Sequence, residues 1–584
     1  MRVTIDIETN DINDWHNLTD LKTLLCICVQ VDDQEPKAVS ADQAFDLMKQ
    51  ADIIVGHNIL GFDIPALMHL FPKFVVDFSK VRDTMVTARL LHADQREKDF
   101  GLPGMPKELV GSHSLKAWGY RLGISKAEAP VFDKVTDGLI EYCKQDVRVT
   151  TALWKYLESH RAFPTATQAI QLEHSFFRIV KQQERVGFAF DMAAAVDLHG
   201  RIAQRLMELE GELAKVFPPK IIARVSEKTG KPLKSKQEVF NPGSRLQIAE
   251  RLKERYGWEP TEFTPDGRPR VDESVLASLD YPEAALLVEY LTLGKRVGQL
   301  ATGNEAWMKL VTKDNRIHGR VNTNGAITGR CTHSKPNMAQ VPTEKEYRSL
   351  FIAGPGKRLV GVDASGLELR CLAHYLGRYD GGIYSKQILE GDIHWANAKA
   401  FGLIKDVEYD KGAEHKAIRN QAKGAIYALI YGAGNDKLGL VLGGSKNRGS
   451  KARFNFEAKV PAYLRLKEDV SRSLASHGFL KGIDGRPLYP RSEHAALNTL
   501  LQSAGAVVMK QACVNSHMFF IDHGIKVDQV ASVHDEYQFV TDPESACMVG
   551  SLVVTAIQQA GKDYGFRCQL DGEYRVGLNW GETH

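Results

Sequence analysis

Hydrophobic and polar residues alternate with a period of two in several short stretches of the chain. Val3, Ile5 and Ile7 alternate with polar residues at the start, and the stretches LLCICVQV, ADIIVG, LVGVD and DQVASVHDEYQFV are further predicted strands. Longer segments between them are rich in helix-forming residues or repeat their chemistry every four positions, as helices do. We therefore predict a multidomain protein of mixed α/β and α+β class.

Residues 419–432, RNQAKGAIYALIYG, form the most informative predicted helix. One chemical pattern recurs at every fourth position, in Arg419, Lys423, Tyr427 and Tyr431. Residues four apart lie on one helix face, one turn above another. Two cations followed by two rings suit a nucleoside triphosphate, because cations bind phosphates and rings stack on bases. Gly432 is expected to end this helix, which taken alone is equally compatible with an ordinary amphipathic helix.

Four carboxylates in the first 160 residues indicate a metal site. Asp6 and Glu8 project from one face of the first strand, where their repulsion favours a cation between them, although a solvated edge strand is the alternative. Asp63 follows the ADIIVG strand, and Asp146 lies four residues after Tyr142 on a predicted helix. This oxygen-rich set suits two Mg²⁺ or Mn²⁺ ions that clamp a phosphodiester, with Tyr142 orienting the attacking water.

The carboxyl-terminal half contains a second pair of candidate metal ligands. Asp363 ends the strand LVGVD, before a helix expected from about Glu368. His534, Asp535 and Glu536 lie at the centre of the strand–turn–strand pattern DQVASVHDEYQFV. Two strands that each deliver a carboxylate at the same level make a metal pair, so Asp363 and Asp535 are predicted to bind two Mg²⁺ ions.

The middle of the chain is predicted to be mainly helical. Residues 165–215 are rich in helix-forming residues, with an interruption near Gly187, and residues 280–311 are predicted to form another long helix. The lysine-rich stretch 217–239 also contains Pro, Gly and Ser, and is predicted to be a basic surface loop. Two long helices with basic tips would suit contact with the backbone of a duplex.

Composition places the chain among soluble globular proteins. Its 584 residues carry a net charge of only +3, so affinity for nucleic acid requires a local basic surface. The eight cysteines include no CxxC pair, and Cys26 and Cys28 are interpreted as strand core, which favours reduced thiols without structural zinc. The chain shows neither a signal peptide nor an apolar run long enough to span a membrane, so an intracellular protein is expected.

The first 160 residues resemble the DnaQ-like 3′–5′ exonucleases. The motifs DxE, NxxxFD and YxxxD of that family occur here in order, ending at Glu8, Asp63 and Asp146. The resemblance implies an RNase H-like α/β domain and two-metal hydrolysis of a DNA 3′ end. Every motif carboxylate is present, so the implied exonuclease is expected to be active.

Three later segments resemble motifs A, B and C of family A (DNA polymerase I-type) DNA polymerases. They are DASGLELRCLAH, the helix 419–432 and VHDE. The segments FNPGSR, IHGRVNTNGAITGR, HSKPNMAQVP and GDIH strengthen the resemblance, which is most marked for replicative polymerases of T-seven-like bacteriophages and covers essentially the whole chain. It implies a right-hand palm, fingers and thumb, and template-directed DNA synthesis with 3′–5′ proofreading.

The resemblance also implies a division into domains. In chain order these are the exonuclease at 1–160, palm entry and helical thumb at 161–350, palm with motif A at 351–390, fingers with motif B at 391–480, and palm with motif C at 481–584. In the implied polymerase site, Asp363 and Asp535 hold the two ions, and Glu536 assists them indirectly.

Roles in nucleotide binding follow from the resemblance. Glu368, assisted by Tyr427, would exclude a ribose 2′-hydroxyl. Tyrosine at position 427 implies weak discrimination against dideoxynucleotides. Arg419, Lys423 and His394 would contact the triphosphate, and Lys423 would also act in catalysis on the departing pyrophosphate.

Roles in DNA binding follow in the same way. Tyr431 would stack at the template base, and His534 would hold the primer terminus. Arg330 and Gln502 would contact minor-groove acceptors that occur in every correct base pair, so they would check geometry without reading sequence. Asn498, one helical turn before Gln502, would support it.

Primer–template DNA and dNTPs are the implied substrates, with two Mg²⁺ (or Mn²⁺) ions at each active site. Replicative helicase–primase and single-strand binding protein are implied partners. The stretch 217–239 is too short for the folded insertion that captures thioredoxin in the T-seven enzyme, so thioredoxin binding is not expected. A monomer is expected, in the cytoplasm of a bacterial host, replicating phage DNA away from any membrane.

Three alternatives to a proofreading polymerase differ in what they leave unexplained. A stand-alone exonuclease with a DNA-binding carboxyl-terminal half does not account for Asp363 and Asp535 occurring together with the 419–432 helix. A non-catalytic replication protein has no use for clustered carboxylates facing phosphate. A single-subunit RNA polymerase relative is disfavoured by Glu368 and by the exonuclease motifs.

Overall fold

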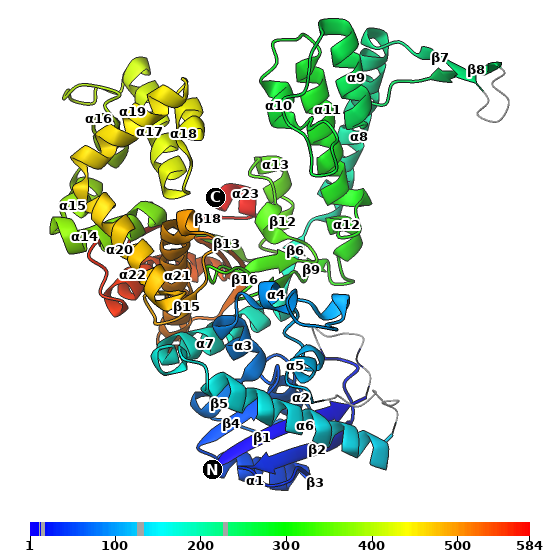
Figure 1. The fold of residues 1–584 in the computed structure, drawn as a ribbon. Coiled ribbons are helices and arrows are strands. Elements are labelled where there is room, and N and C mark those ends of the chain that lie inside the picture. Colours follow the sequence, from blue (N-terminus) through cyan, green and yellow to red (C-terminus); the bar gives the residue numbers. More distant parts are fainter. Residues whose placement is uncertain (11, 13–17, 125–133, 226–231) are drawn as a thin grey trace.

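The computed structural model describes residues 1–10, 12, 18–124, 134–225 and 232–584. One sheet with its helices lies at the amino-terminal end, a second sheet is formed by later parts of the chain, and two helical groups extend from this second sheet (Figure 1). Mixed α/β architecture is thus confirmed. Within the described ranges, no helix is long and apolar enough to cross a membrane.

Five strands form the amino-terminal sheet, in the order β3-β2-β1-β4-β5. β1 pairs antiparallel with β2 and parallel with β4. The strands are β1 (Arg2–Thr9), β2 (Leu24–Val31), β3 (Lys37–Val39), β4 (Ile53–Gly56) and β5 (Val81–Asp83). Val3, Ile5 and Ile7 pack into one core with residues of α1 (Ala41–Gln50) and α2 (Asp63–Leu70). Because side chains alternate along a strand, Asp6 and Glu8 project from the opposite face.

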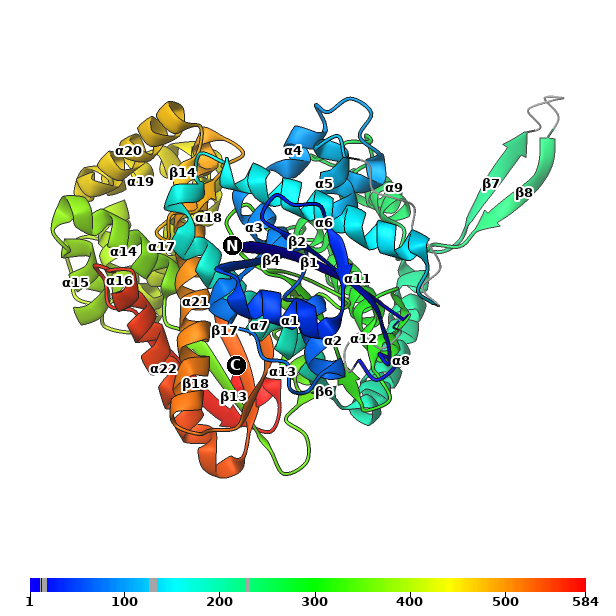
Figure 2. The same ribbon diagram turned by 90° about the horizontal axis from the view of Figure 1, so that it is seen from below.

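Helix α6 (Asp137–Glu158) covers the face of β1 and β2 that carries Asp6 and Glu8 (Figures 1 and 2). Its apolar residues Leu139 and Val147 are buried against Cys26 and Cys28 of β2. Thr136 caps the helix by accepting the backbone N–H of Leu139. The remaining helices of this region are α3 (Thr84–Leu91), α4 (Gln95–Asp99) and α5 (Leu115–Arg121).

Helix α7 (Thr167–Val186) connects the amino-terminal sheet to the rest of the molecule. Adjacent phenylalanines serve two different cores, since Phe177 packs with the amino-terminal sheet and Phe176 with the carboxyl-terminal core. On the same helix, buried Glu173 accepts hydrogen bonds from Arg486 at 2.7 Å and from Lys510 at 2.6 Å. A buried charge pair of this kind is costly to break, which fixes how the two regions meet.

The second sheet has the order β16-β17-β13-β18, with all neighbours antiparallel. Its strands are β13 (Arg358–Ala364), β16 (Val527–Val533), β17 (Glu536–Thr541) and β18 (Gly572–Gly577). Helices α21 (Ala496–Asp522) and α22 (Ala546–Asp563) pack beside it. The strand–turn–strand prediction for 528–540 is thereby confirmed.

One helical group rises from this sheet and carries α8 (Met192–Val216), α9 (Arg245–Tyr256), α10 (Glu273–Ala277), α11 (Ala284–Val297) and α12 (Trp307–Leu310). The predicted interruption near Gly187 is the strand β6 (Phe188–Phe190), with Gly187 at φ 66°. The single helix predicted over 280–311 is wrong. After α11 the chain forms a π-helical turn, Gly298–Thr302, and then α12, where Gly298 and Gly303 weaken the regular helix.

The loop predicted over 217–239 is also wrong in part. Strands β7 (Lys220–Val225) and β8 (Pro232–Glu238) pair antiparallel as a hairpin that projects from this helical group (Figures 1 and 2). Exposed Ile221 and Ile222 and the run of residues before Lys228 supply a strand pattern that the lysines conceal. Lys228 and its neighbours at 226–231 lie outside the described residues.

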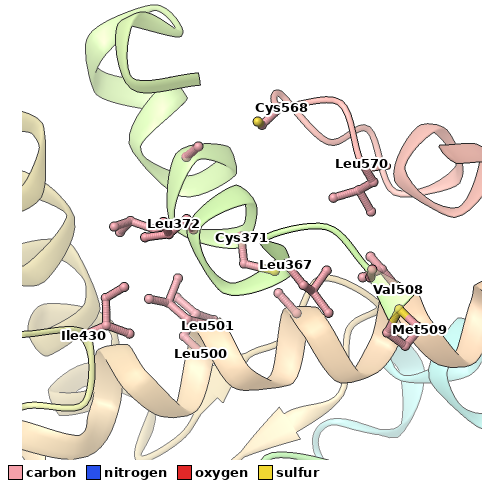
Figure 3. Close-up of a cluster of buried hydrophobic side chains, with 14 of the residues drawn as sticks. Leu367, Cys371, Leu372, Ile430, Leu500, Leu501, Val508, Met509, Cys568 and Leu570 are labelled. Atoms are coloured by element: carbon pink, nitrogen blue, oxygen red, sulfur yellow. The ribbon is translucent and has the colours of Figure 1, made fainter. Parts of the chain in front are cut away.

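The second helical group comprises α14 (Leu367–Asp380), α15 (Ile383–Glu390), α16 (Ile393–Phe401), α17 (Ala413–Ile430), α18 (Asn435–Val441), α19 (Lys446–Lys459) and α20 (Pro461–His477). Figure 3 shows how its base is anchored. Leu367 and Leu372 of α14 lie over Leu500 and Leu501 of α21, beside Ile430 at the end of α17. This apolar contact places α14, α17 and α21 side by side at the end of the β13–β17 strands.

Shorter elements complete the described structure. They are β9 (Arg316–Ile317), β10 (Arg320–Asn322), β11 (Thr332–Ser334), β12 (Phe351–Ile352), β14 (Leu480–Lys481), β15 (Pro487–Leu488), α13 (Lys345–Arg348) and α23 (Trp580–Thr583).

Candidate active sites

A two-residue turn joins β16 to β17 and carries His534 and Asp535, since Val533 pairs with Glu536 across the hairpin. His534 has φ 57°, in the left-handed region that tight hairpin turns require. On the other side of β17, Asp363 pairs with Glu536. The backbone N–H of Ala364 donates to the Asp535 carbonyl oxygen at 3.1 Å. The structure therefore brings Asp363 and Asp535 to the same end of two adjacent strands.

The electrostatics of this pair favour a cation. Reduced hydration within the site and repulsion from Asp535 and Glu536 raise the pKa of Asp363 to about 7, although its side chain reaches solvent. Burial likewise raises the pKa of Asp535. A divalent cation between two such carboxylates cancels the free-energy cost of their mutual repulsion. The oxygen ligands of Asp363 and Asp535 therefore fit hard metal ions.

The carboxylate of Glu536 bonds to residues other than Asp363 and Asp535. Its carboxylate accepts hydrogen bonds from Gln538 at 2.6 Å, from the Trp580 indole at 2.5 Å and from His584 at 2.8 Å. Burial alone would raise its pKa, but the hydrogen bonds from His584 and Gln538 outweigh burial and lower it. Arg348 adds an ion pair at 3.5 Å. Glu536 is thus an ionised, buried charge next to Asp363, and its partners had no sequence signal.

Glu368, in the first turn of α14, is held by two residues from elsewhere in the chain. The Tyr431 hydroxyl donates to its Oε1 at 2.5 Å, and Arg330 donates to the same oxygen at 3.2 Å. Burial together with this contact raises the pKa of Tyr431. Glu368, Tyr431 and Arg330 therefore form one cluster beside Asp535.

Helix α17 carries the predicted face, with two cationic residues followed by two tyrosine rings along the helix. Arg419 donates from Nε to Asp392 at 2.6 Å, and Asp392 in turn caps α16 through the backbone N–H groups of His394 and Trp395. Lys423 is exposed one turn further along. Burial, and then the charges of Arg419 and Lys423, lower the pKa of His394 to about 4, so its ring is neutral near pH 7. Asp392 was not identified from the sequence.

The ring end of α17 continues toward Glu368. The centroids of Tyr427 and Tyr431 lie 6.5 Å apart with rings inclined by 24°, and Tyr427 lies 6.4 Å from His394. The helix ends as predicted, because Gly432 has φ 73° and Ala433 donates back to the Ala428 carbonyl. A Cβ on residue 432 would lie 2.9 Å from the His494 carbonyl oxygen, so glycine is also required sterically.

Asn498 and Gln502 lie one turn apart on α21, whose middle packs against Leu367 of α14. Both side chains are partly buried. The Oδ1 atom of Asn498 is buried and has no hydrogen-bond partner among the residues that the structure describes. Both amide groups therefore lie on the part of α21 that packs against α14, the helix that carries Glu368.

The amino-terminal carboxylates also gather. Carboxylate oxygens of Asp6 and Glu8 and the sulfur of Cys143 lie within 4.8 Å of one another. Asp63 is buried at the start of α2, and burial followed by repulsion from Asp83 and Asp146 raises its pKa to about 7. Together these carboxylates fit divalent cations for the same reason as the Asp363 pair.

Tyr142 and Asp146 are both buried on α6. Asp83, which the sequence did not single out, is fully buried and organises the segment before Asp63. It accepts backbone N–H groups from Asn58 at 3.1 Å and Leu60 at 3.1 Å, and also caps α3. Burial raises its pKa to about 6 despite these bonds. Asp83 therefore fixes the loop that delivers Asp63.

Comparison with known proteins decides the family. The model for DNA polymerase family A matches residues 217–582. This chain belongs to DNA polymerase family A. The predicted membership is confirmed, and this family A polymerase is a DNA-directed DNA polymerase, a nucleotidyltransferase of DNA replication. Enzymes of the family generally use divalent metal ions, which agrees with the donor set described above.

Its relatives include phage enzymes. It is 34% identical to the DNA-directed DNA polymerase of Enterobacteria phage T3, over 92% of this chain and 93% of that protein. The polymerase of Escherichia phage T7 is also 34% identical, over 91% of this chain and 92% of that protein. Among solved structures, the fold of this polymerase is similar to the POL domain of Pol1 from M. smegmatis in complex with DNA primer-template and dNTP. That likeness has a TM-score of 0.77 at 18% identity, over 100% of this chain and 96% of the other.

Proposed function

We propose that this polymerase copies primer–template DNA at the Asp363–Asp535 pair and proofreads at a separate 3′–5′ exonuclease site on the amino-terminal sheet. The observation that carries the proposal is the meeting of Asp363 and Asp535 at adjacent strand ends, within reach of the cation-to-ring face of α17. A pure DNA-binding protein would gain nothing from repelling carboxylates directed at phosphate.

In the polymerase site, Asp363 and Asp535 would hold two Mg²⁺ (or Mn²⁺) ions. When bound, such ions would activate the primer 3′-hydroxyl and neutralise charge on the triphosphate. Glu536 would act on Asp363 through its negative charge and through its position on the adjacent strand. It is therefore a positioning residue in this proposal.

The face of α17 would bind the incoming nucleotide. Lys423 is exposed and free to approach phosphate, and would neutralise or protonate the departing pyrophosphate. Arg419 would bind the same phosphates, held in place by Asp392. Neutral His394 would hydrogen-bond to the triphosphate. Glu368 and Tyr427 would together exclude a ribose 2′-hydroxyl.

The DNA would meet the cluster at the end of α17. Tyr431 would stack on the template base, and His534, exposed in its turn, would hold the primer terminus. Arg330 and Gln502 would donate to minor-groove acceptors of the new base pair, with Asn498 supporting Gln502. For Tyr431 and Arg330 to act in this way, they must release Glu368.

In the exonuclease site, Asp6, Glu8, Asp63 and Asp146 would hold two divalent ions, which activate water and stabilise the leaving oxygen of a 3′-terminal phosphodiester. Tyr142 would orient that water. The strand order β3-β2-β1-β4-β5 is the order expected of an RNase H-like domain and supports this assignment. We assign residues 1–160 to the exonuclease, 161–350 to palm entry and thumb, 351–390 and 481–584 to the palm, and 391–480 to the fingers.

The biological setting proposed is replication of phage DNA in the cytoplasm of a bacterial host. A monomer would act there with helicase–primase and single-strand binding protein. The β7–β8 hairpin projects from the proposed thumb, but its short length argues against thioredoxin capture.

Primer extension and single-strand degradation test the two halves of the proposal. We expect the wild-type chain with Mg²⁺ to extend a primer with dNTPs far better than with rNTPs. We also expect it to shorten single-stranded DNA from the 3′ end without dNTPs. The variant Asp6→Ala/Glu8→Ala is expected to lose degradation and keep extension. Loss of neither activity in that variant would refute the exonuclease assignment.

A further inference from the structure

The register of β1 against β2 places thiols beside the proposed exonuclease carboxylates. Asp6 is paired with Cys28, and Glu8 with Cys26. Directly opposite residues of an antiparallel pair project from the same face. The two cysteines are therefore cross-strand neighbours of the two carboxylates, on the face that α6 covers.

Helix α6 adds a third thiol from above. The sulfur atoms of Cys26, Cys28 and Cys143 lie within 4.8 Å of one another, and all three residues are buried. Cys143 also donates to the backbone carbonyl oxygen of Asp6 at 3.4 Å and to its Oδ2 at 3.5 Å. Cys28 donates to the Ile140 carbonyl at 3.7 Å. The Cys143 thiol thus links the other two thiols to the carboxylate of Asp6.

We propose that Cys26, Cys28 and Cys143 form a binding site for a thiophilic divalent cation of the Zn²⁺ class, next to the proposed Mg²⁺ site at Asp6 and Glu8. Three buried sulfur atoms within 4.8 Å of one another are close enough to bind one ion, as in a three-cysteine site with one open position. Thiolates bind soft and borderline ions such as Zn²⁺ and Cd²⁺, whereas Mg²⁺ selects oxygen ligands. The two classes of ion would therefore distribute between adjacent sites by ligand chemistry.

Binding has a defined proton balance. Each thiol would give up its proton to solvent as its sulfur bonds to the ion, so three protons leave as one cation enters. The bound ion would carry three thiolates and one further ligand. Asp6 lies closest to supply it, because its Oδ2 already contacts Cys143.

Occupation of this site would act on Asp6. The Cys143 thiol can no longer donate to Asp6 once it is a metal-bound thiolate, and Asp6 would be drawn toward the new ion. Exonuclease activity would then fall while DNA synthesis at the distant Asp363–Asp535 pair continued. This inhibitory consequence rests on the proposed exonuclease function, whereas the binding itself does not.

Cadmium provides a direct probe. The full chain, kept reduced and in Mg²⁺ buffer, would be titrated with Cd²⁺ while ultraviolet thiolate-to-metal charge-transfer absorption is recorded. We expect the absorption to saturate at one ion per chain, with a cadmium NMR signal in the range of three-sulfur coordination. The variants Cys28→Ser and Cys143→Ser are expected to lose it, and Cys547→Ser, which removes an exposed cysteine on α22, is expected to retain it.

The cadmium signal of the wild-type chain tests the site even if a variant at one of the buried cysteines misfolds. A cadmium signal of oxygen or nitrogen coordination only, or full absorption in folded Cys28→Ser, would overturn the site. In parallel, Zn²⁺ at fixed Mg²⁺ is expected to slow single-strand degradation by about 10-fold or more while primer extension is unchanged. Three-sulfur binding without any slowing would overturn the inhibitory coupling, and absence of degradation before zinc is added would instead refute the exonuclease.

Discussion

The hydroxyl of Tyr431 donates a hydrogen bond to the carboxylate of Glu368 at 2.5 Å. Tyr431 caps the carboxyl end of the helix proposed to receive the nucleotide, and Glu368 lies in the first turn of the helix that follows the strand of Asp363. The residue proposed to exclude a ribose 2′-hydroxyl therefore bonds to the residue proposed to stack on the template base. We therefore expect nucleotide binding at Glu368 to require that Tyr431 gives up this hydrogen bond.

Glu368→Ala is expected to relax sugar selection. Removing the carboxylate opens the space where a ribose 2′-hydroxyl would otherwise lie against it, so the preference for dNTP over rNTP is expected to fall by about 10-fold or more. The measurement is the ratio of kcat/KM for dNTP and rNTP in single-nucleotide extension. Glu390→Ala, at the end of α15, serves as the control. An unchanged ratio would remove Glu368 from the sugar contact.

Lys423→Ala is expected to slow chemistry more than binding. The side chain would stabilise charge that develops only as pyrophosphate departs, so single-turnover incorporation is expected to fall by about 10²–10³-fold. Lys416→Ala removes an exposed lysine from the same helix and is expected to behave as wild type. If Lys423→Ala raises KM with little change in the rate constant, Lys423 only binds phosphate.

Tyr427→Phe is expected to increase discrimination against dideoxynucleotides. The phenol hydroxyl can substitute for the hydrogen bond that a missing 3′-hydroxyl would make, and phenylalanine cannot. The measurement is the rate of ddNTP relative to dNTP incorporation, with Tyr409→Phe as the control for loss of a tyrosine hydroxyl. Equal chain-terminator sensitivity in wild type and Tyr427→Phe would contradict the position assigned to this ring.

The two proposed metal sites are expected to make stability depend on pH and on divalent ions. The pKa values of Asp363 and Asp63 are both raised to about 7, for Asp63 chiefly by burial and for Asp363 by reduced hydration within its site and repulsion from neighbouring carboxylates. A carboxyl group whose pKa is raised in the folded state stabilises the fold fully at pH values below its ordinary pKa. This contribution to the free energy of unfolding is lost as the pH rises through about 7. Because divalent cations bind the ionised forms, Mg²⁺ is expected to raise Tm more at about pH 8 than at about pH 5.5.

Thermal unfolding with Mg²⁺ and with NaCl at matched ionic strength measures this difference. The double variant Asp63→Asn/Asp363→Asn is expected to lose most of it. An equal Mg²⁺ effect on Tm at both pH values in the wild-type chain would show that these carboxyls do not exchange protons for metal.

Local patterns allowed the elements around the polymerase site to be predicted, because the residues that define them are close in sequence. The repeat from Arg419 to Tyr431 lies along one helix, and Asp363 follows an apolar run near the end of its strand, which continues one residue further to Ala364. The hairpin at β7–β8 was missed because lysines and prolines hid its strand pattern. The helix over 280–311 was predicted too long because the glycines at the π-turn, Gly298 and Gly303, were not taken as an interruption.

Partners distant in sequence were beyond prediction. Glu368 is held by Arg330 and Tyr431 from opposite directions along the chain, and Glu536 by His584. The cluster of Cys26, Cys28 and Cys143 exists only because strand register and helix packing bring separate segments together. Cysteine spacing had suggested no such group.

Two chemically separate sites in one chain are central to the proposed function, and Asp535→Ala tests their separation most directly. Extension of a primer with four dNTPs and 3′ degradation of single-stranded DNA would be measured on the same folded preparation, with Asp528→Ala, at an exposed position of β16, as control. We expect the Asp535→Ala variant to lose primer extension and to degrade single-stranded DNA at the wild-type rate. Extension that survives, or loss of both activities together, would contradict it.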